Sequence, residues 1–227
     1  MLREILLRFR AWRYRRSIGQ QNFAGKTVSE IFTETYRKRY WRSRESVSGR
    51  GAELGQTALL RAELPALFRN YGIRSLLDLP CGDFNWMRQV DLGEIRYTGG
   101  DIVAELIAQN QEKYAGERRT FLELDLLTDA LPDADCILVR DCLVHFSLEH
   151  IRQALENIRK SNITYLLTTS FPGTRHNEDI QTGHWRTLNL QLAPFFFPEP
   201  LVCLNEGCTE ENGAYADKSL CLWKIER

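Results

Sequence analysis

The spacing of apolar residues changes along the chain at about residue 60. Before that point, apolar and aromatic residues alternate with arginine in helical stretches that a polar loop at 46–55 interrupts. After it, short continuous apolar runs alternate with segments of helical periodicity. Such a succession is typical of a mainly parallel sheet covered on both faces. The pattern predicts a basic helical N-terminal extension or lid at 1–60 and an α/β domain at 61–227.

Five apolar runs predict the parallel strands, and the segments between them predict helices. The strands are expected at 75–80, 96–102, 119–125, 136–141 and 164–171, and the helices at 59–73, 84–90, 103–116 and 147–161. Two further strands, 200–206 and 219–226, are joined by a polar loop without a helix, which predicts an antiparallel pair at one edge. The expected fold class is α/β: a Rossmann-like, mainly parallel seven-stranded sheet with an antiparallel last strand pair.

A carboxylate stands at the end of each of the first four predicted strands. These residues are Asp78, Asp101, Asp125 and Asp141. A single aspartate after a strand usually caps a helix or belongs to a loop. Ligands of open α/β sheets bind beyond the carboxyl ends of the strands, so four such residues at one edge predict a ligand site.

The turn after the first strand, PCGDF at 80–84, is unsuited to a dinucleotide. A pyrophosphate loop needs a second glycine so that the backbone can approach the phosphates. Phe84 occupies that place, and Asp83 would repel a phosphate. The turn suits a nucleoside ligand that carries positive charge, and Asp101 lies near the ~20-residue offset at which an acid binds ribose hydroxyls.

Four segments resemble the motifs of class I S-adenosylmethionine-dependent methyltransferases. They are LLDLPCGDF (76–84), YTGGDI (97–102), FLELDLL (121–127) and DCILVRDCLVHF (135–146). The resemblance extends over residues 72–171 and implies S-adenosylmethionine as the cofactor. It departs from the family at Pro80 and Phe84, where the first motif usually has glycines.

The resemblance also implies which residues contact the cofactor. Asp78 and the Cys81–Gly82 backbone would hold the methionine end, Asp101 the ribose, and Asp125 with Leu126 the adenine edge. Asp141 would face the methionine ammonium or the acceptor. The full set of expected cofactor-binding residues is Asp78, Cys81, Gly82, Asp83, Asp101, Ile102, Asp125, Leu126 and Asp141.

Methyl transfer requires alignment of the reacting atoms and, for a hydroxyl acceptor, removal of a proton. His145, just after the fourth strand, is the expected base, with Asp141 as the second catalytic candidate. The alternative is that His145 caps the next helix or packs against the cofactor.

The long polar segment 171–200 is the expected acceptor loop, because binding residues are often carried on loops. His176, His184, Trp185 and Arg186 are its expected substrate-binding residues. Together with His145 they favour O-methylation of a small-molecule or glycan-like hydroxyl acceptor.

Two other functions stay open. The basic aromatic segment 36–44 could bind RNA or an acidic protein chain, and the fold could serve a non-catalytic ligand-binding or partner-binding module. Lys plus Arg and Asp plus Glu both number 30, so no global charge favours nucleic acid, which is not an expected partner. The strand-four segment also lacks the N/D-P-P-Y signature common in methyltransferases that modify planar amino groups.

The first 16 residues carry six arginines against one glutamate on an amphipathic helical pattern. This helix either contacts an anionic membrane surface or packs on the domain; it is too short and too charged to span a bilayer. The expected location is the cytoplasm, with peripheral contact to the inner face of a membrane as an option. The six cysteines show no CxxC pair, so free buried thiols and no metal site are expected.

Overall fold

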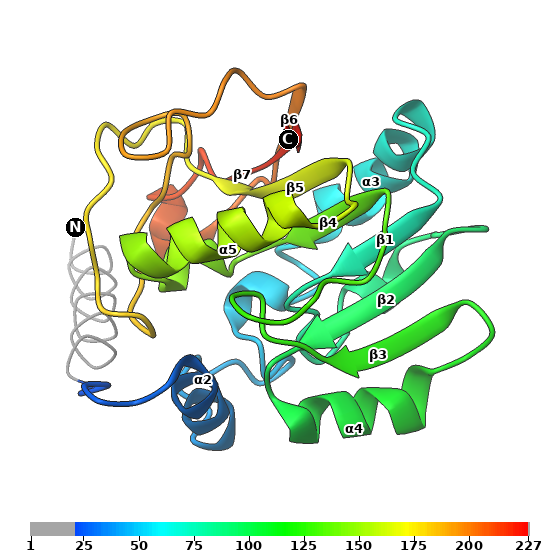
Figure 1. Ribbon diagram of the computed structural model, residues 1–227, viewed down its shortest axis with the longest axis horizontal. Coiled ribbons are helices and arrows are strands. Elements are labelled where there is room, and N and C mark those ends of the chain that lie inside the picture. The colour runs from blue at the N-terminus through cyan, green and yellow to red at the C-terminus, as the bar shows by residue number, and fades with distance from the viewer. Residues whose placement is uncertain (1–20, 227) are drawn as a thin grey trace.

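The computed structural model describes residues 21–226, which form an α/β domain around one seven-stranded sheet. The strand order is β3-β2-β1-β4-β5-β7-β6 (Figure 1). The strands are β1 (Ser75–Asp78), β2 (Arg96–Asp101), β3 (Arg119–Glu123), β4 (Cys136–Val139), β5 (Tyr165–Ser170), β6 (Val202–Asn205) and β7 (Ser219–Lys224). Strands β1 to β5 are parallel, and β7 is antiparallel to both β5 and β6. The predicted Rossmann-like sheet is confirmed.

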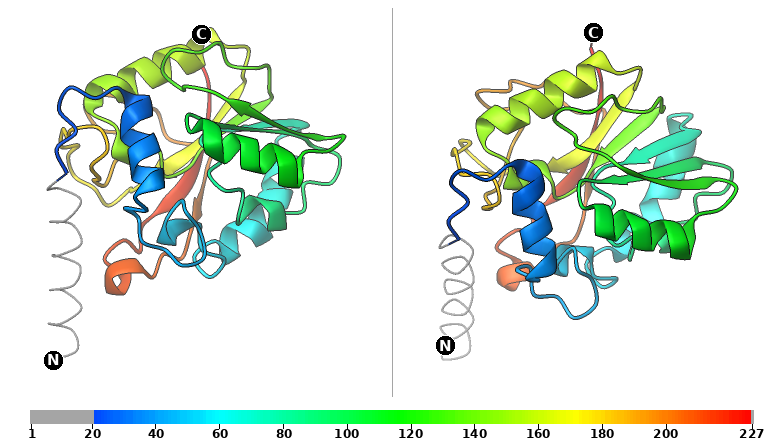
Figure 2. Two further views of the ribbon diagram at one scale, coloured as in Figure 1. Left: turned by 90° about the horizontal axis from the view of Figure 1, so that it is seen from below. Right: turned by 60° about the horizontal axis from the view of Figure 1, so that its bottom comes forward.

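Helices cover both faces of the sheet. The α-helices within residues 21–226 are α2 (Val28–Arg37), α3 (Ala58–Asn70), α4 (Ala104–Tyr114) and α5 (Leu148–Lys160), of which α3 and α4 cover one face and α5 the other. Neighbouring residues of β1 point to opposite faces: Leu77 packs in the core beneath α5, and Leu76 packs in the core beneath α3 and α4. Figures 1 and 2 show α2 beyond the carboxyl ends of the strands, apart from these two layers.

The expected cap of α5 is present. The Ser147 hydroxyl accepts a hydrogen bond from the His150 N–H at 3.2 Å, and Glu149 lies in the first turn. A second carboxylate helps, because Asp179 accepts a bond from the Leu148 N–H at 2.8 Å. The helix is therefore fixed at the end that faces the strand ends.

The helix expected at 84–90 is absent, and this prediction is wrong. The segment forms only a 3-10 turn, Met87–Gln89. Phe84, at the expected start, has a φ of 58°, and its ring packs on Tyr97 and Phe121 in the core. A left-handed residue cannot begin a right-handed helix, and burial of its ring fixes that conformation. The third and fourth strands also end two residues earlier than predicted, at Glu123 and Val139.

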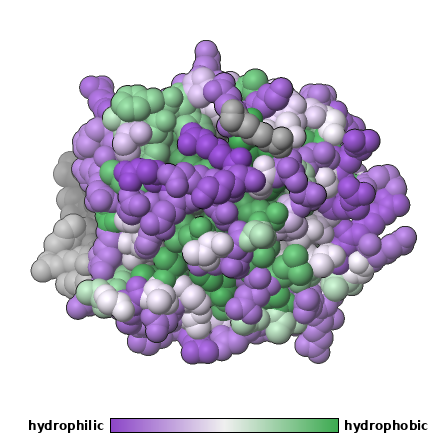
Figure 3. Space-filling view, in the orientation of Figure 1, coloured by the Kyte–Doolittle hydropathy of each residue, from purple (hydrophilic) through white to green (hydrophobic). Residues whose placement is uncertain are grey.

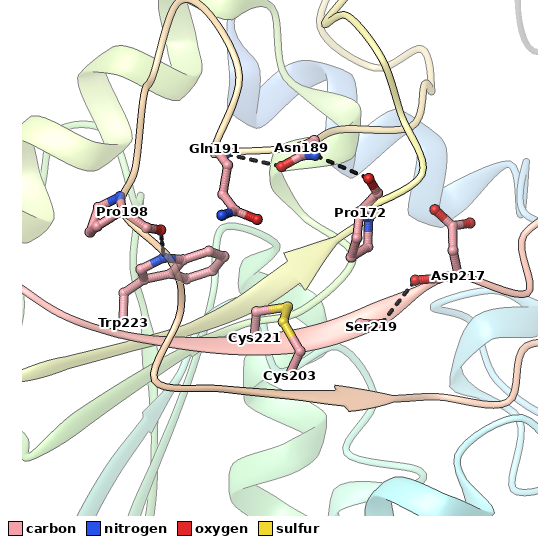
Figure 4. The surroundings of a disulfide bond; sticks show 9 residues. All are labelled: Pro172, Asn189, Gln191, Pro198, Cys203, Asp217, Ser219, Cys221 and Trp223. Atoms are coloured by element: carbon pink, nitrogen blue, oxygen red, sulfur yellow. Dashed lines mark hydrogen bonds between the residues drawn. A yellow bond between two sulfur atoms is a disulfide. The ribbon is translucent and has the colours of Figure 1, made fainter.

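Two of the six cysteines form a disulfide, which corrects the expectation of free thiols throughout. Cys203 of β6 and Cys221 of β7 lie opposite each other in the strand register and are bonded (Figure 4). The register of this pair could not be derived from the spacing of the cysteines. The other four cysteines, Cys81, Cys136, Cys142 and Cys208, are free and buried as expected.

The predicted basic helix at 1–16 lies outside the described residues. Of the expected extension, the structure describes α2, a turn at 38–45, and a loop at 46–52 that we call the wall loop. The long helix α3 begins at Ala58, close to the predicted boundary. Within residues 21–226, no helix is both long enough and apolar enough to cross a membrane.

Candidate active site

A pocket of about 400 Å³ opens at the carboxyl ends of the strands. The strand order reverses between β1 and β4, and residues that follow both strands line the pocket. Ligand sites of open α/β sheets are found at this switch point. Figure 3 shows apolar surface gathered in a hollow in the middle of this face, below the polar band over α5.

Asp78, the last residue of β1, lies at the bottom of the pocket with an exposed fraction of 3%. Its carboxylate accepts a hydrogen bond from the Tyr97 hydroxyl at 2.7 Å. Burial raises the pKa of Asp78 to about 7, against the lowering effect of the Tyr97 bond. The described residues offer this carboxyl no ion-pair partner, so a cationic ligand would stabilise its charged form.

The turn after β1 uses its own backbone groups internally. The Cys81 N–H donates to the Gly100 carbonyl at 2.7 Å, and the Gly82 N–H donates to Asp101 at 3.1 Å. The Gly82 carbonyl accepts from the Asn110 amide at 2.7 Å. Because the N–H groups of Cys81 and Gly82 are occupied within the protein, they are not free to bind a phosphate.

Asp83 lines the pocket but holds the wall loop in place. Its carboxylate accepts from the Ser46 hydroxyl at 2.9 Å and from the Val47 N–H at 2.8 Å, and its own N–H donates to the Ser48 hydroxyl at 3.3 Å. Gly82 allows this contact: a Cβ at that position would lie 2.0 Å from the Ser48 Oγ. The expected cofactor ligand Asp83 is therefore first an anchor for the loop.

Asp101 ends β2 and is 6% exposed. Besides the bond from Gly82, it accepts one from the Val103 N–H at 3.0 Å. Burial raises its pKa to about 6, while these backbone bonds act in the opposite direction. Each carboxylate oxygen has a further lone pair, so hydroxyl donors of a ligand can still bind.

Ile102, Asp125 and Leu126 complete this half of the pocket. Asp125 accepts a bond from the Leu127 N–H at 2.8 Å, which forms a tight turn after β3. Leu126 is 4% exposed and packs in the core under α5. The strand-end residues predicted from the sequence are thus brought together at one edge.

Asp141, beyond β4, belongs to a charged network that four segments share. Lys218 donates to its carboxylate at 2.6 Å, and Arg140 lies 3.4 Å from it. Arg140 also makes a two-point contact with Glu206, at 2.6 and 3.1 Å, and donates to the Gly51 carbonyl of the wall loop at 2.8 Å. Lys218 lies 3.4 Å from Glu206. Two cations and two carboxylates therefore balance each other.

This balance changes the chemistry of Asp141. Burial alone would raise its pKa, but the charges of Lys218 and Arg140 and the Lys218 bond hold it well below the usual range. The pKa of Lys218 is raised, because Asp141 and Glu206 outweigh the effect of its burial. Asp141 is thus an ionised carboxylate that already has its counterion, unlike Asp78 and Asp101.

His145 lines the pocket and has a defined tautomer. Its Nδ1 lies 2.8 Å from the His184 carbonyl oxygen. A carbonyl can only accept, so Nδ1 carries the hydrogen and neutral His145 keeps its lone pair at Nε2. Burial lowers the pKa of His145 to about 4, and the bond to His184 acts in the opposite direction. The ring is neutral at physiological pH and is able to accept a proton, although weakly.

The four expected acceptor-loop residues separate into two pairs. His184 and Trp185 line the pocket, whereas His176 is exposed and contacts only Glu178. Arg186 is 6% exposed and donates to the carbonyls of Leu143 and Phe146, both at 2.9 Å. Arg186 thus fixes the His145 turn and does not line the pocket.

Several pocket residues were missed by the sequence analysis. They are Phe32, Trp41, Lys218, Glu210 and Tyr215. The Trp41 ring lies 5.5 Å from that of His145, although 104 positions separate them. The aromatics interleaved in segment 36–44 were visible as a signal, but were considered there for RNA binding. Within residues 21–226, no group of three or more His, Cys, Asp or Glu residues has the geometry of a metal site.

Several solved structures with the same fold are methyltransferases. Human N-acetylserotonin methyltransferase in complex with S-adenosylmethionine has a TM-score of 0.65 at 14% identity, covering 96% of this chain and 67% of that chain. Burkholderia thailandensis 1,6-didemethyltoxoflavin-N1-methyltransferase, with its substrate and S-adenosylhomocysteine bound, gives 0.59 at 15%, covering 88% of both chains. Magnesium protoporphyrin IX methyltransferase from Synechocystis PCC 6803, with bound S-adenosylhomocysteine, gives 0.58 at 14%, covering 88% and 98%.

These likenesses establish the fold: the chain has the architecture of the class I S-adenosylmethionine-dependent methyltransferases. By sequence, no protein family and no curated protein matches it.

Proposed function

We propose that this chain is an S-adenosylmethionine-dependent methyltransferase that methylates a hydroxyl group of a small-molecule or glycan-like acceptor. The proposal rests on one observation above all. Two buried carboxyls, Asp78 and Asp101, end neighbouring strands in one pocket, and neither has an ion-pair partner among the described residues. Their raised pKa values mark a site that a cationic nucleoside would complete.

The residues present fit this cofactor. Asp101 stands at the end of β2 with lone pairs for ribose hydroxyls, and Ile102 and Leu126 supply apolar surface for a base. The carboxyl of Asp78, which lines the pocket beside the Cys81–Gly82 turn, suits a cationic amino-acid end. A pyrophosphate fits poorly at this turn, because β1 is followed by a 3-10 turn and not by the N-terminus of an α-helix.

When bound, the cofactor supplies a methyl group on a sulfonium, which is a good leaving group. The protein then has to align the acceptor oxygen and take its proton. We assign proton transfer to Nε2 of His145, with the His184 carbonyl holding the ring in the required tautomer. We assign to Asp141, with its counterion Lys218, the role of orienting the ligand groups that bind beside it.

The cofactor assignment is tested by calorimetric titration of S-adenosylmethionine and S-adenosylhomocysteine into the wild type, with NAD as a negative control. We expect micromolar binding of the first two ligands. Asp101→Asn should weaken binding by about 1.5–3 kcal/mol, because it removes a charged hydrogen-bond acceptor. Glu112→Gln, an acid on α4 outside the pocket, is the matched control and should bind like the wild type. A wild type that prefers NAD, or binds neither ligand, refutes the proposal.

The fold could also serve a non-catalytic module. Binding of S-adenosylmethionine with no methyl transfer to any hydroxyl acceptor would favour that alternative.

A further inference from the structure

Aromatic rings line the half of the pocket beyond β4, and they come from segments far apart in the chain. On one side, Trp41 lies with its ring 5.5 Å from that of His145 and 6.4 Å from that of Phe32. On the other, the Trp185 ring lies 4.8 Å from that of Tyr215 and 6.0 Å from that of Phe171. All five aromatic residues and His145 line the same pocket.

Backbone hydrogen bonds join the segment that carries Trp185 to the turn that carries His145. The Gly183 N–H donates to the His145 carbonyl at 2.8 Å, and the Arg186 N–H donates to the Val144 carbonyl at 3.1 Å. Trp185 therefore runs alongside the His145 turn. The rings and His145, whose lone pair is at Nε2, therefore line one pocket.

Most polar groups of this half are already bonded within the protein. Asp141 is paired with Lys218, Arg140 with Glu206, and the His184 Nε2 lies 3.1 Å from the Gln21 carbonyl. A few groups keep capacity toward a ligand. They include Nε2 of His145, one N–H of Lys218 beyond its two carboxylate partners, and the Glu210 carboxyl, which has no hydrogen bond within residues 21–226. The side chains of Arg50 and Glu211 also line the pocket.

Such a site discriminates against a sugar. A glycan ring carries several hydroxyls, each of which loses hydrogen bonds to water on binding, and unpaired buried groups are costly. A flat apolar ring with one hydroxyl instead uses the aromatic walls for stacking and needs few polar partners.

We propose that the acceptor is a phenol-class compound, with a planar aromatic body between the rings of Trp41 and Trp185 and its hydroxyl at Nε2 of His145. This inference rests on the proposed methyltransferase function and selects among its acceptors. In the reaction the phenol oxygen forms a bond to the methyl carbon, and its proton passes to Nε2. The sulfur–carbon bond breaks, and its electron pair stays on sulfur.

The acidity of a phenol also suits the low basicity of His145. Burial lowers the pKa of His145 to about 4, so the ring is a weak base. A phenol has a pKa of about 10, as in tyrosine, and an aliphatic sugar hydroxyl is a far weaker acid. A weak base is better matched to the phenol.

The test titrates defined probes into the full chain saturated with S-adenosylhomocysteine. The phenols are phenol, naphthol and hydroxycoumarin, and the sugars are methyl glucoside, methyl mannoside and methyl maltoside. We expect binding of at least one phenol and of no sugar. Trp185→Leu should weaken that binding about tenfold, while Trp185→Phe, which keeps a ring, should stay within about threefold of the wild type. Phe196→Ala, at an exposed ring outside the pocket, is the control and should change nothing.

A second readout follows product formation with S-adenosylmethionine and the best phenol. His145→Gln should lower the rate by about 10²–10⁴-fold and leave S-adenosylmethionine affinity unchanged. Two outcomes overturn this inference alone. In the first, a sugar binds to the wild type and this binding is lost in Trp185→Leu. In the second, the wild type binds S-adenosylhomocysteine but no phenol. Failure of the wild type to bind S-adenosylhomocysteine overturns the proposed function itself.

Discussion

The carboxyl groups in the two halves of the pocket have pKa shifts of opposite sign. At the ends of β1 and β2, Asp78 and Asp101 are buried without a counterion, and their pKa values are raised to about 7 and about 6. Beyond β4, Asp141 is paired with Lys218, and its pKa is lowered. The first half holds two buried carboxyls without an ion-pair partner among residues 21–226, so a cationic ligand is expected there.

The halves also differ in how far along the chain their contacts reach. Asp78 and Tyr97 are 19 positions apart, as are Gly82 and Asp101. Asp141 and Lys218 are 77 positions apart. The contacts of Asp78 and Asp101 stay within residues 78–103, whereas the Asp141 network joins the wall loop, β4 and the end of the chain. A substitution in the second half is therefore more damaging to the fold.

The largest effect is expected at Glu206, whose side chain is 1% exposed and faces Arg140. Glu206→Ala leaves Arg140 and Lys218 buried with too little negative charge, and loss of one partner of a buried pair costs about 3–5 kcal/mol. Urea unfolding measures this as a lower midpoint. Arg37→Ala removes an exposed pair with Glu105 and should lower the midpoint far less, because solvent screens this pair. Equal losses in the two variants would contradict the difference in burial.

The second effect is the pH dependence of the first half. The raised pKa values mean that Asp78 and Asp101 hold protons near pH 6.5 in the free protein, and a cationic ligand displaces them. S-adenosylmethionine affinity should rise between pH 5 and 8, with release of about one proton at pH 6.5. Calorimetry in two buffers of different ionisation enthalpy measures the release, and Asp78→Asn should reduce it.

The same shifts fix the sign for stability without ligand. Carboxyls whose folded pKa is raised stabilise the fold below their unfolded pKa, and this contribution is lost as the pH rises through about 6 and 7. The melting temperature of the free protein should therefore fall from pH 5 to 8, and Asp78→Asn should flatten that trend. A melting temperature that rises from pH 5 to 8 would contradict the raised pKa values assigned to the first half of the pocket.

A third, smaller effect is expected at Asp83, whose carboxylate binds the wall loop. Asp83→Asn should loosen residues 46–52, because the charged acceptor for Ser46 and Val47 is lost, and should weaken S-adenosylmethionine about threefold to tenfold. Hydrogen exchange of the wall loop measures the loosening. Weaker binding with an unchanged loop would assign Asp83 to direct contact instead.

The smallest effect is expected at His176. Its side chain is 76% exposed, and its one polar side-chain contact within residues 21–226 is with Glu178. His176→Ala should leave stability and all ligand affinities within the error of measurement. A loss of phenol binding would extend the acceptor region to this loop.

The contrast in contact range explains what could be predicted from the sequence. Strand ends follow from apolar runs, so Asp78 and Asp101 were placed correctly. The helix expected at 84–90 was wrong because the φ of Phe84 depends on burial against Phe121, a later strand. The rings of Trp41 and Tyr215 could not be assigned to the pocket, since their neighbours are set by tertiary packing alone.

Gly82, in the turn after β1, lies in close contact with Ser48, which is 34 positions earlier in the chain. The effect of a substitution at one of these residues therefore depends on the other residue. Gly82→Ala would displace the wall loop even if no ligand touched Gly82, and the loss would be misread as a missing ligand contact. Ser48→Gly removes the obstructing hydroxyl and should partly restore the double variant. A small residue is thus required in the turn by its partner loop, and engineering of either segment has to treat them as one unit.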